Sequence, residues 1–217
     1  MSKGFMLVCD GSNGAGKTTV IQGIADYLEQ QGFEVVLTRE PGGTPIGEKV
    51  RSVILDPSTP EMCSMTELML FGAARAQHVE EKIRPALEAG KVVISDRFDA
   101  ATFSFQHYAR GIDLETIKTI NELALGGFKP DMNLILDLDP ELGLQRVNQR
   151  GEGLDRLEDE KMEFLHRARE GYLAQAKAAP ERFSVIDASE DKQSVLSACL
   201  RVVDSVIAAS RRDNTNC

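Results

Sequence analysis

Five short apolar runs recur along the chain, separated by longer segments of mixed polarity. Most positions within each run are apolar, whereas a half-exposed strand would alternate apolar and polar residues. Continuous apolar strands are typical of a parallel sheet that is covered on both faces. The pattern therefore predicts five buried parallel strands. They lie at residues 5–9, 34–38, 92–95, 134–138 and 184–187.

Segments with apolar residues at helical spacing separate these runs, which is the arrangement of an α/β fold. After the first run, for example, Val20, Ile24 and Leu28 lie on one side of a predicted helix. Pro85 is expected to kink or divide the longest predicted helix. The predicted helices span residues 19–28, 46–55, 66–88, 99–107, 113–125, 141–149, 158–178 and 191–209.

No internal repeat, low-complexity tract or linker interrupts this alternation. With 217 residues, the chain is long enough to bury a sizeable core without disulfide bonds. We therefore expect one domain over residues 1–210 and a polar tail over residues 211–217 that frays.

The charge and the composition narrow the possible partners. A net charge of −9 argues against a non-specific nucleic-acid binder or a membrane-surface binder, because both need a basic surface. No apolar run approaches the roughly 18 residues that span a membrane, and the first predicted strand leaves no room for a signal peptide. The four cysteines form no CxxC pair, which favours a reduced compartment. We expect a cytoplasmic protein that binds neither nucleic acid nor membranes.

The sequence GSNGAGKT, between the first predicted strand and the first predicted helix, matches the phosphate-binding pattern G-x-x-x-x-G-K-[ST]. In such a loop, glycines turn backbone N–H groups toward an anion, and the helix start adds partial positive charge. The lysine would reach the outer phosphates, and the threonine hydroxyl would ligate Mg²⁺. This context predicts a three-layer P-loop NTPase fold that binds a nucleoside triphosphate; a chance glycine turn is the alternative. The residues of the loop are Gly11, Ser12, Asn13, Gly14, Ala15, Gly16, Lys17 and Thr18.

Acidic residues lie at the ends of three of the predicted strands, at the edge where open α/β sheets bind ligands; Glu40 lies at the end of the second. Asp96 comes directly after a buried run, where P-loop proteins place a Mg²⁺-directed carboxylate, and we expect it to act through a metal-bound water. Capping of the next helix is the alternative for Asp96. That alternative is favoured for Asp137 and Asp139, because Pro140 suits a helix start.

Arginines are concentrated in the segments that follow the strand ends, although the protein is acidic. A guanidinium group matches the geometry of a phosphate and can bind it through two hydrogen bonds. For any one arginine, a solvated helix face is the alternative. Residues 146–157 are polar and predict a lid that closes arginines over the phosphates and excludes water, unless they form an ordinary loop. The arginines are Arg39, Arg51, Arg75, Arg97, Arg146, Arg150 and Arg156.

Phe71 and Arg75 are four residues apart on a predicted helix and therefore share a face. A flat ring beside a donor fork can stack on a nucleobase and hydrogen-bond to its edge. Core packing plus a surface charge is the commoner use of this spacing. His78, His107 and His166 lack partners at catalytic spacing, and we expect them to be surface or packing residues.

Taken together, these features resemble thymidylate kinases of the bacterial type, which are nucleoside monophosphate kinases. The resemblance extends along essentially the whole chain, and its middle motifs are specific to these kinases. The motifs are GSNGAGKTT at 11–19, TREPGGT at 38–44, RSVIL at 51–55, FGAARAQ at 71–77, DRFDAATFSFQ at 96–106, ARGI at 109–112 and LDR at 154–156.

The resemblance implies the strand order 2-3-1-4-5, a homodimer, and Mg²⁺-dependent transfer of the γ-phosphoryl group of ATP to dTMP, which gives dTDP. It implies that Phe71 stacks on thymine and that Arg75 bonds the edge of the base. Arg97 and Arg39 would grip the dTMP phosphate, and Arg146 would serve the ATP side. The implied substrate-binding residues are Arg39, Glu40, Arg51, Phe71, Arg75, Arg97, Thr102, Phe105 and Gln106.

The resemblance also assigns the catalytic charges. Families with a basic residue at the position of Gly14 place their catalytic arginine in the loop. Because Gly14 carries no charge, this role is expected to pass to Arg150 and Arg156 in the lid, beside Lys17 and Arg97.

The chain departs from the resembled pattern at three positions. Asn13 stands where an acid is usual, and Ala101 and Phe105 replace the usual Ser and Tyr. The missing Tyr hydroxyl removes a polar contact near the sugar. Two rival functions stay open: a P-loop kinase for uridylate, cytidylate or a non-nucleotide acceptor, and a nucleotide-dependent switch that transfers nothing.

Overall fold

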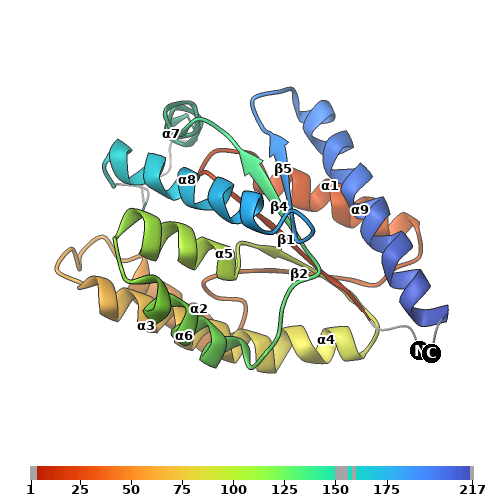
Figure 1. Cartoon of the computed structure of the whole chain (residues 1–217), viewed down its shortest axis with the longest axis horizontal. Coiled ribbons are helices and arrows are strands. Elements are labelled where there is room, and N and C mark those ends of the chain that lie inside the picture. Colours follow the sequence, from red (N-terminus) through yellow and green to blue (C-terminus); the bar gives the residue numbers. More distant parts are fainter. Residues whose placement is uncertain (1–3, 150–155, 158–159, 216–217) are drawn as a thin grey trace.

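One fully parallel sheet forms the centre of the molecule, with the strand order β2-β3-β1-β4-β5 that the resemblance implied (Figure 1). The structure is a computed structural model that describes residues 4–149, 156–157 and 160–215, with side chains described as far as residue 211. All five predicted strands are confirmed. The strands are β1 (Met6–Gly11), β2 (Val35–Arg39), β3 (Val92–Asp96), β4 (Met132–Asp137) and β5 (Phe183–Asp187).

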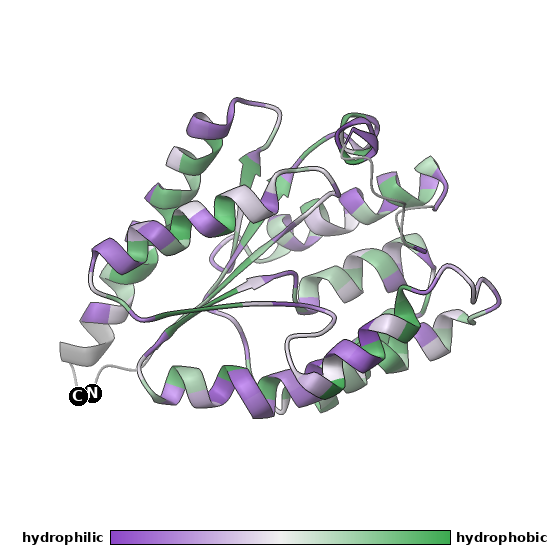
Figure 2. Cartoon of the chain, turned by 180° about the vertical axis from the view of Figure 1, so that it is seen from behind, coloured by the Kyte–Doolittle hydropathy of each residue, from purple (hydrophilic) through white to green (hydrophobic). Residues whose placement is uncertain are grey.

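The middle strand, β1, shows why the runs are apolar throughout. All of its residues are buried. Leu7 and Cys9 pack into the core on one face of the sheet, while Met6 and Val8 pack into the core on the other. Figure 2 shows the strands at the centre coloured as hydrophobic, with hydrophilic positions mainly on the outer sides of the helices. Both faces are therefore removed from water, as a doubly covered parallel sheet requires.

Helices cover both faces of the sheet, which confirms the three-layer fold class. On one face, α1 (Lys17–Gln30) and α9 (Lys192–Thr215) lie side by side and pack on the core that contains Leu7 (Figure 1). The other face is covered by the chain that follows β2, β3 and β4. The remaining helices are α2 (Pro45–Ile54), α3 (Ser64–His78), α4 (Arg84–Glu88), α5 (Asp99–Thr102), α6 (Leu114–Leu125), α7 (Pro140–Asn148) and α8 (Met162–Ala178).

Two of the predicted helices contain a π-helical stretch. The predicted helix at 66–88 consists of α3, the π-helical segment η1 (Val79–Ile83) and α4. Pro85 lies in the first turn of α4, and because it has no N–H and its ring crowds the preceding turn, the hydrogen-bond ladder changes just before it. The predicted helix at 99–107 is α5 followed by the π-helical segment η2 (Phe103–Ala109). Segment η2 lies at the candidate site.

The last helix, α9, passes for a membrane span between Lys192 and Arg211 by length and composition alone. Its apolar side nevertheless packs into the core, where Cys199 and Val203 are fully buried. Asp204, next to Val203, is exposed. One polar and one apolar face are typical of a helix that packs on a globular core. The helix continues to Thr215, beyond the predicted start of the tail, because no Gly or Pro interrupts it.

Candidate active site

The glycine loop between β1 and α1 adopts conformations that favour glycine. Gly11, Gly14 and Gly16 have φ angles of 126°, 74° and 90°, in the left-handed region. The loop also packs tightly against α7: a Cβ atom at Gly14 would lie 2.2 Å from the carbonyl oxygen of Gly143. Both constraints hold the backbone of the loop in one shape, so its N–H groups are pre-arranged for an anion.

Lys17 lies at the start of α1 and is 9% exposed. Its Nζ donates a hydrogen bond to the carbonyl oxygen of Ser12, at 3.0 Å, across the glycine loop. Burial, together with the nearby charge of Arg97, lowers the pKa of Lys17 to about 8, although Asp96 and Asp10 oppose the shift. The ammonium group is therefore poised for an anion that would restore its ordinary pKa.

Arg97, directly after β3, is the one non-glycine residue with a left-handed φ, of 67°, in the part of the chain that the structure describes. Such a conformation is costly for a side chain with a Cβ and persists where its surroundings impose it. Here the guanidinium is fixed on several sides and lies over the ring of Phe105, 5.2 Å from its centroid. Its hydrogen bonds go to Asp10 Oδ1 (3.1 Å), the Gly11 carbonyl (2.9 Å), Tyr172 Oη (2.8 Å) and Asn13 Oδ1 (2.5 Å).

Asp10 is a buried partner of this arginine. It is fully buried and accepts further hydrogen bonds from the Gly11 N–H at 3.1 Å and from Tyr172 Oη at 2.5 Å. Burial raises the pKa of Asp10, and Arg97 opposes that shift. The carboxylate and the guanidinium therefore compensate each other inside the protein.

A second buried charge network lies on the opposite side of the cleft and is centred on Glu40. Its carboxylate accepts from Arg75 Nε at 2.9 Å and contacts His78 Nδ1 at 3.0 Å. His78 is fully buried, and its other ring nitrogen lies 2.7 Å from Thr38 Oγ1. It is therefore a packing residue with two polar partners. The Arg75 fork continues to Asn121 Oδ1, at 2.6 Å, and to a backbone carbonyl.

The loop after β2 is held by its own contacts. Arg39 pairs with Glu48 at 2.9 Å, and Glu48 also accepts from a backbone N–H of the loop. Arg51 Nη1 donates to the carbonyl oxygen of Pro41 at 2.9 Å. Thr44 caps α2 by accepting from its first turn. These contacts place the loop beside Arg75.

A cleft of about 280 Å³ lies between the two networks and joins the glycine loop to the α3 side. Leu157, which follows the undescribed residues 150–155, also lines it. Most of the residues expected from the sequence share this one cleft. They are Asn13, Gly14, Gly16, Lys17, Thr18, Arg39, Glu40, Arg51, Phe71, Arg75, Asp96, Arg97, Thr102, Phe105 and Gln106.

Other expected residues lie away from this cleft or outside the described part of the chain. Gly11, Ser12 and Ala15 complete the glycine loop, and Ser12 Oγ donates to the Leu138 carbonyl at 3.0 Å. Arg146 Nη1 donates to the carbonyl oxygen of Ala188, just after β5, at 3.2 Å.

The predicted lid is only partly described. Arg150 lies outside the described residues. Arg156 Nε donates to the carbonyl oxygen of Ile54 at 2.8 Å, and its Nη2 pairs with Glu67. The guanidinium of Arg156 therefore lies on the α2–α3 side.

Comparison with known proteins decides the family. The thymidylate kinase family matches residues 9–198 of the chain. The thymidylate kinase of Hahella chejuensis is 46% identical over 198 residues, which cover 91% of this chain and 95% of that protein. The thymidylate kinase of Desulfosudis oleivorans is 48% identical over 214 residues, covering 96% and 97%. The chain belongs to the thymidylate kinase family.

The fold agrees with this family. The crystal structure of thymidylate kinase from Ehrlichia chaffeensis matches with a TM-score of 0.76 and 33% identity, covering 93% of this chain and 99% of that one. Thymidylate kinases are nucleotide-binding transferases of nucleotide biosynthesis that use ATP to phosphorylate dTMP to dTDP. The resemblance drawn from the motifs is thereby confirmed.

For a thymidylate kinase, the strand-end acids divide by role. Asp96 and the exposed Thr18 both line the cleft beside Lys17. Asp139 instead caps α7 and accepts from the Glu141 N–H at 3.1 Å, so the predicted cap is confirmed. The cap expected for Asp137 is wrong, because its carboxylate forms a two-point ion pair with Arg169 instead, at 2.7 and 2.9 Å.

Some buried polar side chains beside the cleft escaped the sequence analysis. Asp10 could have been found, because it is an acid at a strand end directly before the glycine loop. Tyr172 and Glu67 carry no local signal, because their partners lie far away in the sequence.

Proposed function

We propose that the cleft's two sides divide one reaction between them, with ATP on the glycine-loop side and dTMP on the α3 side. As a member of its family, the chain transfers the γ-phosphoryl group of ATP to dTMP and forms dTDP. The observation that carries the division is the single cleft that holds Lys17 at one end and Phe71 and Arg75 at the other.

On the donor side, the backbone N–H groups of the glycine loop bind the phosphates of ATP. Lys17 neutralises the charge on the outer phosphates, and Arg146 contributes from the β5 side. The contact of the Arg146 guanidinium with the Ala188 carbonyl supports this role. Ala188 lies just before α9, and α9 packs beside α1, the helix that follows the glycine loop.

On the acceptor side, Phe71 stacks on the base and Arg75 bonds its edge. Arg75 is only 1% exposed, and Glu40 fixes its orientation. Thr102, Phe105 and Gln106 complete the base pocket from α5 and η2. Arg97 and Arg39 bind the acceptor phosphate, and Glu40 and Arg51 close that wall.

The chemistry needs no general base. The second ionisation of a phosphate monoester has a pKa near 6, so the dTMP phosphate is largely a dianion at neutral pH and is itself the nucleophile. Its oxygen attacks the γ-phosphorus, and ADP leaves with the electrons of the broken bond. Catalysis then rests on positioning and on neutralising the charge that spreads over the transferred group. Lys17, Arg97 and Arg150 supply these charges, whereas the contacts of Arg156 with Ile54 and Glu67 favour a positioning role.

Mg²⁺ fits the donor side, where the Thr18 hydroxyl would ligate it and the Asp96 carboxylate would hold it through a metal-bound water. Both groups offer oxygen, which Mg²⁺ prefers, and this ion is usually bound by one or two side chains together with substrate phosphates. When bound there, Mg²⁺ would supply positive charge that offsets the charge of the ATP phosphates. Removal of divalent cations with EDTA should abolish turnover, and addition of Mg²⁺ should restore it. Full activity in EDTA would contradict this assignment.

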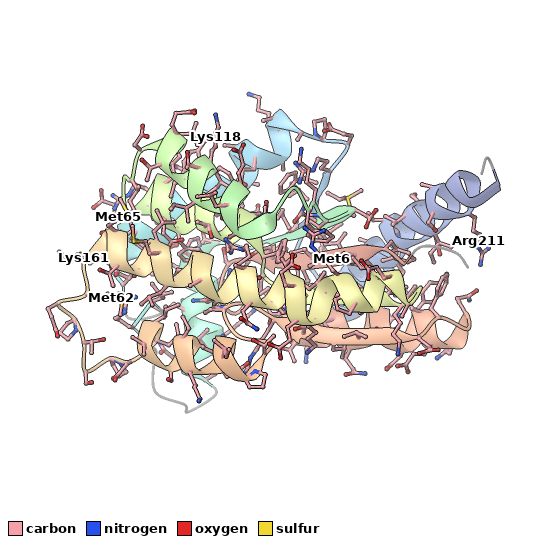
Figure 3. The ribbon with its side chains drawn as sticks, turned by 90° about the horizontal axis from the view of Figure 1, so that it is seen from below. Met6, Met62, Met65, Lys118, Lys161 and Arg211 are labelled. Carbon is pink, nitrogen blue, oxygen red and sulfur yellow. The ribbon has the colours of Figure 1, made fainter. Side chains whose placement is uncertain are left out.

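We further propose a homodimer formed through α3 and α6. Met65 and Met69 on α3 are 40% and 55% exposed, and Leu123 on α6 is 76% exposed. Figure 3 shows Met65 on α3 and Lys118 on the neighbouring α6. Exposed apolar side chains on adjacent helices are typical of a covered surface. Leu123→Glu should convert a dimer to a monomer in light scattering; a wild-type monomer would refute the proposal.

A cytoplasmic location is also proposed. Cys9, Cys63 and Cys199 are free thiols, in keeping with a reduced compartment. Cell fractionation should recover the protein with cytoplasmic markers, and recovery with membranes would contradict it.

The experiment that tests the function is Mg-ATP-dependent diphosphate formation with dTMP, dUMP, UMP, CMP, AMP and GMP. The proposal predicts a large preference for dTMP. Equal or greater activity with UMP or CMP would show that the acceptor is not dTMP and would favour a uridylate or cytidylate kinase. ATP hydrolysis that no acceptor stimulates would indicate a nucleotide switch.

A further inference from the structure

Glu67, on α3, is a buried carboxylate on which three side chains from other segments converge. It is 1% exposed. Gln106 Nε2 donates to its Oε1 at 2.9 Å. Arg110 binds both carboxylate oxygens, at 3.2 and 3.1 Å, and Arg156 Nη2 reaches Oε2 in a short contact of 2.5 Å. None of these partners is close to Glu67 in the sequence.

The charges in this cluster are balanced by a second carboxylate. Arg110 pairs with Glu160 as well as with Glu67, so two arginines face two acids. Burial opposes the charged form of Glu67, but hydrogen bonds from Arg110 and Gln106 hold its pKa below the usual range. Arg110 also lies over the ring of Phe164, 4.6 Å from its centroid. The cluster is therefore a fixed ionic network.

The cluster joins two walls of the acceptor side. Gln106 lines the cleft from η2, and Leu157, the residue after Arg156, lines the same cleft. Arg156 is held in place by its pair with Glu67 and by the carbonyl oxygen of Ile54 at the end of α2. The Glu67 carboxylate thus fixes the side chain of Gln106, a polar group of the pocket. Through Arg156 it also fixes the backbone next to Leu157, an apolar group of the pocket.

We propose that Glu67 is a positioning residue for dTMP, and that Arg156 acts with it to shape the acceptor pocket rather than on the transferred phosphoryl group. This inference rests on the proposed function, since it takes the α3 side of the cleft as the dTMP site. Loss of either partner leaves Gln106 or Leu157 free to move, which weakens acceptor binding. The donor side does not share this support, because its loop is fixed by the Gly11–Thr18 backbone.

The test is a double-mutant cycle with Glu67→Gln, Arg156→Met and the double variant, read as kcat and as KM for each substrate. Each single change should raise the KM for dTMP about tenfold, a coupling within the usual range for residues in contact. The KM for ATP should stay within about twofold, and kcat at saturating dTMP within about threefold. The double variant should be no worse than the worse single variant.

The controls separate the possible failures. Arg156→Met leaves Glu67 paired with Arg110, so it retains the fold if Glu67→Gln does not. Arg156→Lys should recover part of the dTMP affinity, because it restores one charge without the fork. Glu80→Gln, which removes an exposed ion pair with Arg84, should change nothing.

Two results would overturn the inference. A fall of kcat by about a hundredfold or more in Arg156→Met, with the KM for dTMP unchanged, would assign Arg156 to the transferred phosphoryl group. Additive effects in the double variant would show that the two residues act independently. A wild-type enzyme that does not phosphorylate dTMP would refute the proposed function itself, a different outcome that is visible before any variant is made.

Discussion

The two sides of the cleft are held in shape by different kinds of interaction. On the glycine-loop side, one continuous stretch supplies backbone N–H groups whose directions follow from left-handed glycines and from close packing on Gly143. On the α3 side, side chains from several helices and loops meet, and buried carboxylates at Glu40 and Glu67 hold them. The first side depends on backbone shape, and the second depends on charge compensation.

This difference predicts how each side fails. A site built from the backbone keeps its shape when one side chain is removed, but it loses a charge that the reaction needs. A site of paired buried charges loses its shape when one partner is removed, because the remaining charge stays in a poorly solvated place. Arg97 lies between the two cases, with a strained backbone and a guanidinium held by Asp10 and Asn13.

The largest expected effect is on turnover at the glycine loop. Lys17→Ala should lower kcat by about a thousandfold or more, because it removes a charge contact to the transferred group in a partly dry site. Its melting temperature should hardly change, since the side chain has one hydrogen bond, to the Ser12 carbonyl. Enzyme kinetics and thermal unfolding test this together. Near-normal kcat would show that Lys17 takes no part in the reaction. Lys91→Ala, which removes an exposed ion pair with Glu34, serves as the control.

The next effect is on stability at the acceptor side. Glu40→Ala should lower the free energy of unfolding by about 3–5 kcal/mol, because Arg75 would keep a buried charge without its partner. Urea denaturation measures the change. Glu80→Ala removes an exposed ion pair and should cost less than about 1 kcal/mol. Equal losses of unfolding free energy in the Glu40→Ala and Glu80→Ala variants would show that the acceptor side does not depend on its buried charge pair.

The pH dependence should also differ between the two sides. In the proposed function Lys17 must be charged to bind ATP, and its pKa of about 8 means that the ammonium is lost as the pH rises through that value. The kcat/KM for ATP should therefore fall about tenfold per pH unit above pH 8. The kcat/KM for dTMP at saturating ATP should stay level to about pH 9, because bound phosphates raise the pKa of Lys17 again. The same pH dependence of kcat/KM for ATP and for dTMP would contradict the assignment of Lys17 to the ATP side.

The smallest expected effect isolates the strained backbone at Arg97. Arg97→Gly and Arg97→Ala remove the same guanidinium, but only glycine adopts a φ of 67° without a steric cost. The glycine variant should be more stable by about 1 kcal/mol in urea denaturation. Ala73→Gly, at an exposed position of α3, should shift stability in the opposite direction. A more stable alanine variant at 97 would show that the backbone there relaxes.

The glycine loop could be found from the sequence by a local signal, whereas most of the residues on the α3 side needed the family resemblance, for a physical reason. The glycine loop is contiguous, and burial leaves a periodic signal in each strand and helix, so residues such as Lys17 and the cap at Asp139 could be found locally. The strand order needed the family resemblance, because pairing between strands leaves no local trace.

Side-chain contacts between distant segments leave no such trace either. His78 was expected to be a surface or packing residue, and its packing role brings it against Glu40 and Thr38. The contacts of Arg156 with Glu67 and of Tyr172 with Asp10 join segments that no pattern relates. The π-helical segments η1 and η2 were not predicted, because helical periodicity does not distinguish a π-helix from an α-helix.

The independence of the two sides is tested most directly by calorimetric titration of Arg75→Lys with dTMP and, separately, with a non-hydrolysable ATP analogue. Lysine keeps the charge but loses the fork that reaches Glu40 and Asn121 and that is proposed to bond the base. The account predicts that dTMP binds at least about tenfold more weakly, while the analogue binds within about twofold of wild type. Equal weakening of both ligands, or unchanged dTMP affinity, would contradict a cleft with a backbone-built donor side and a charge-built acceptor side.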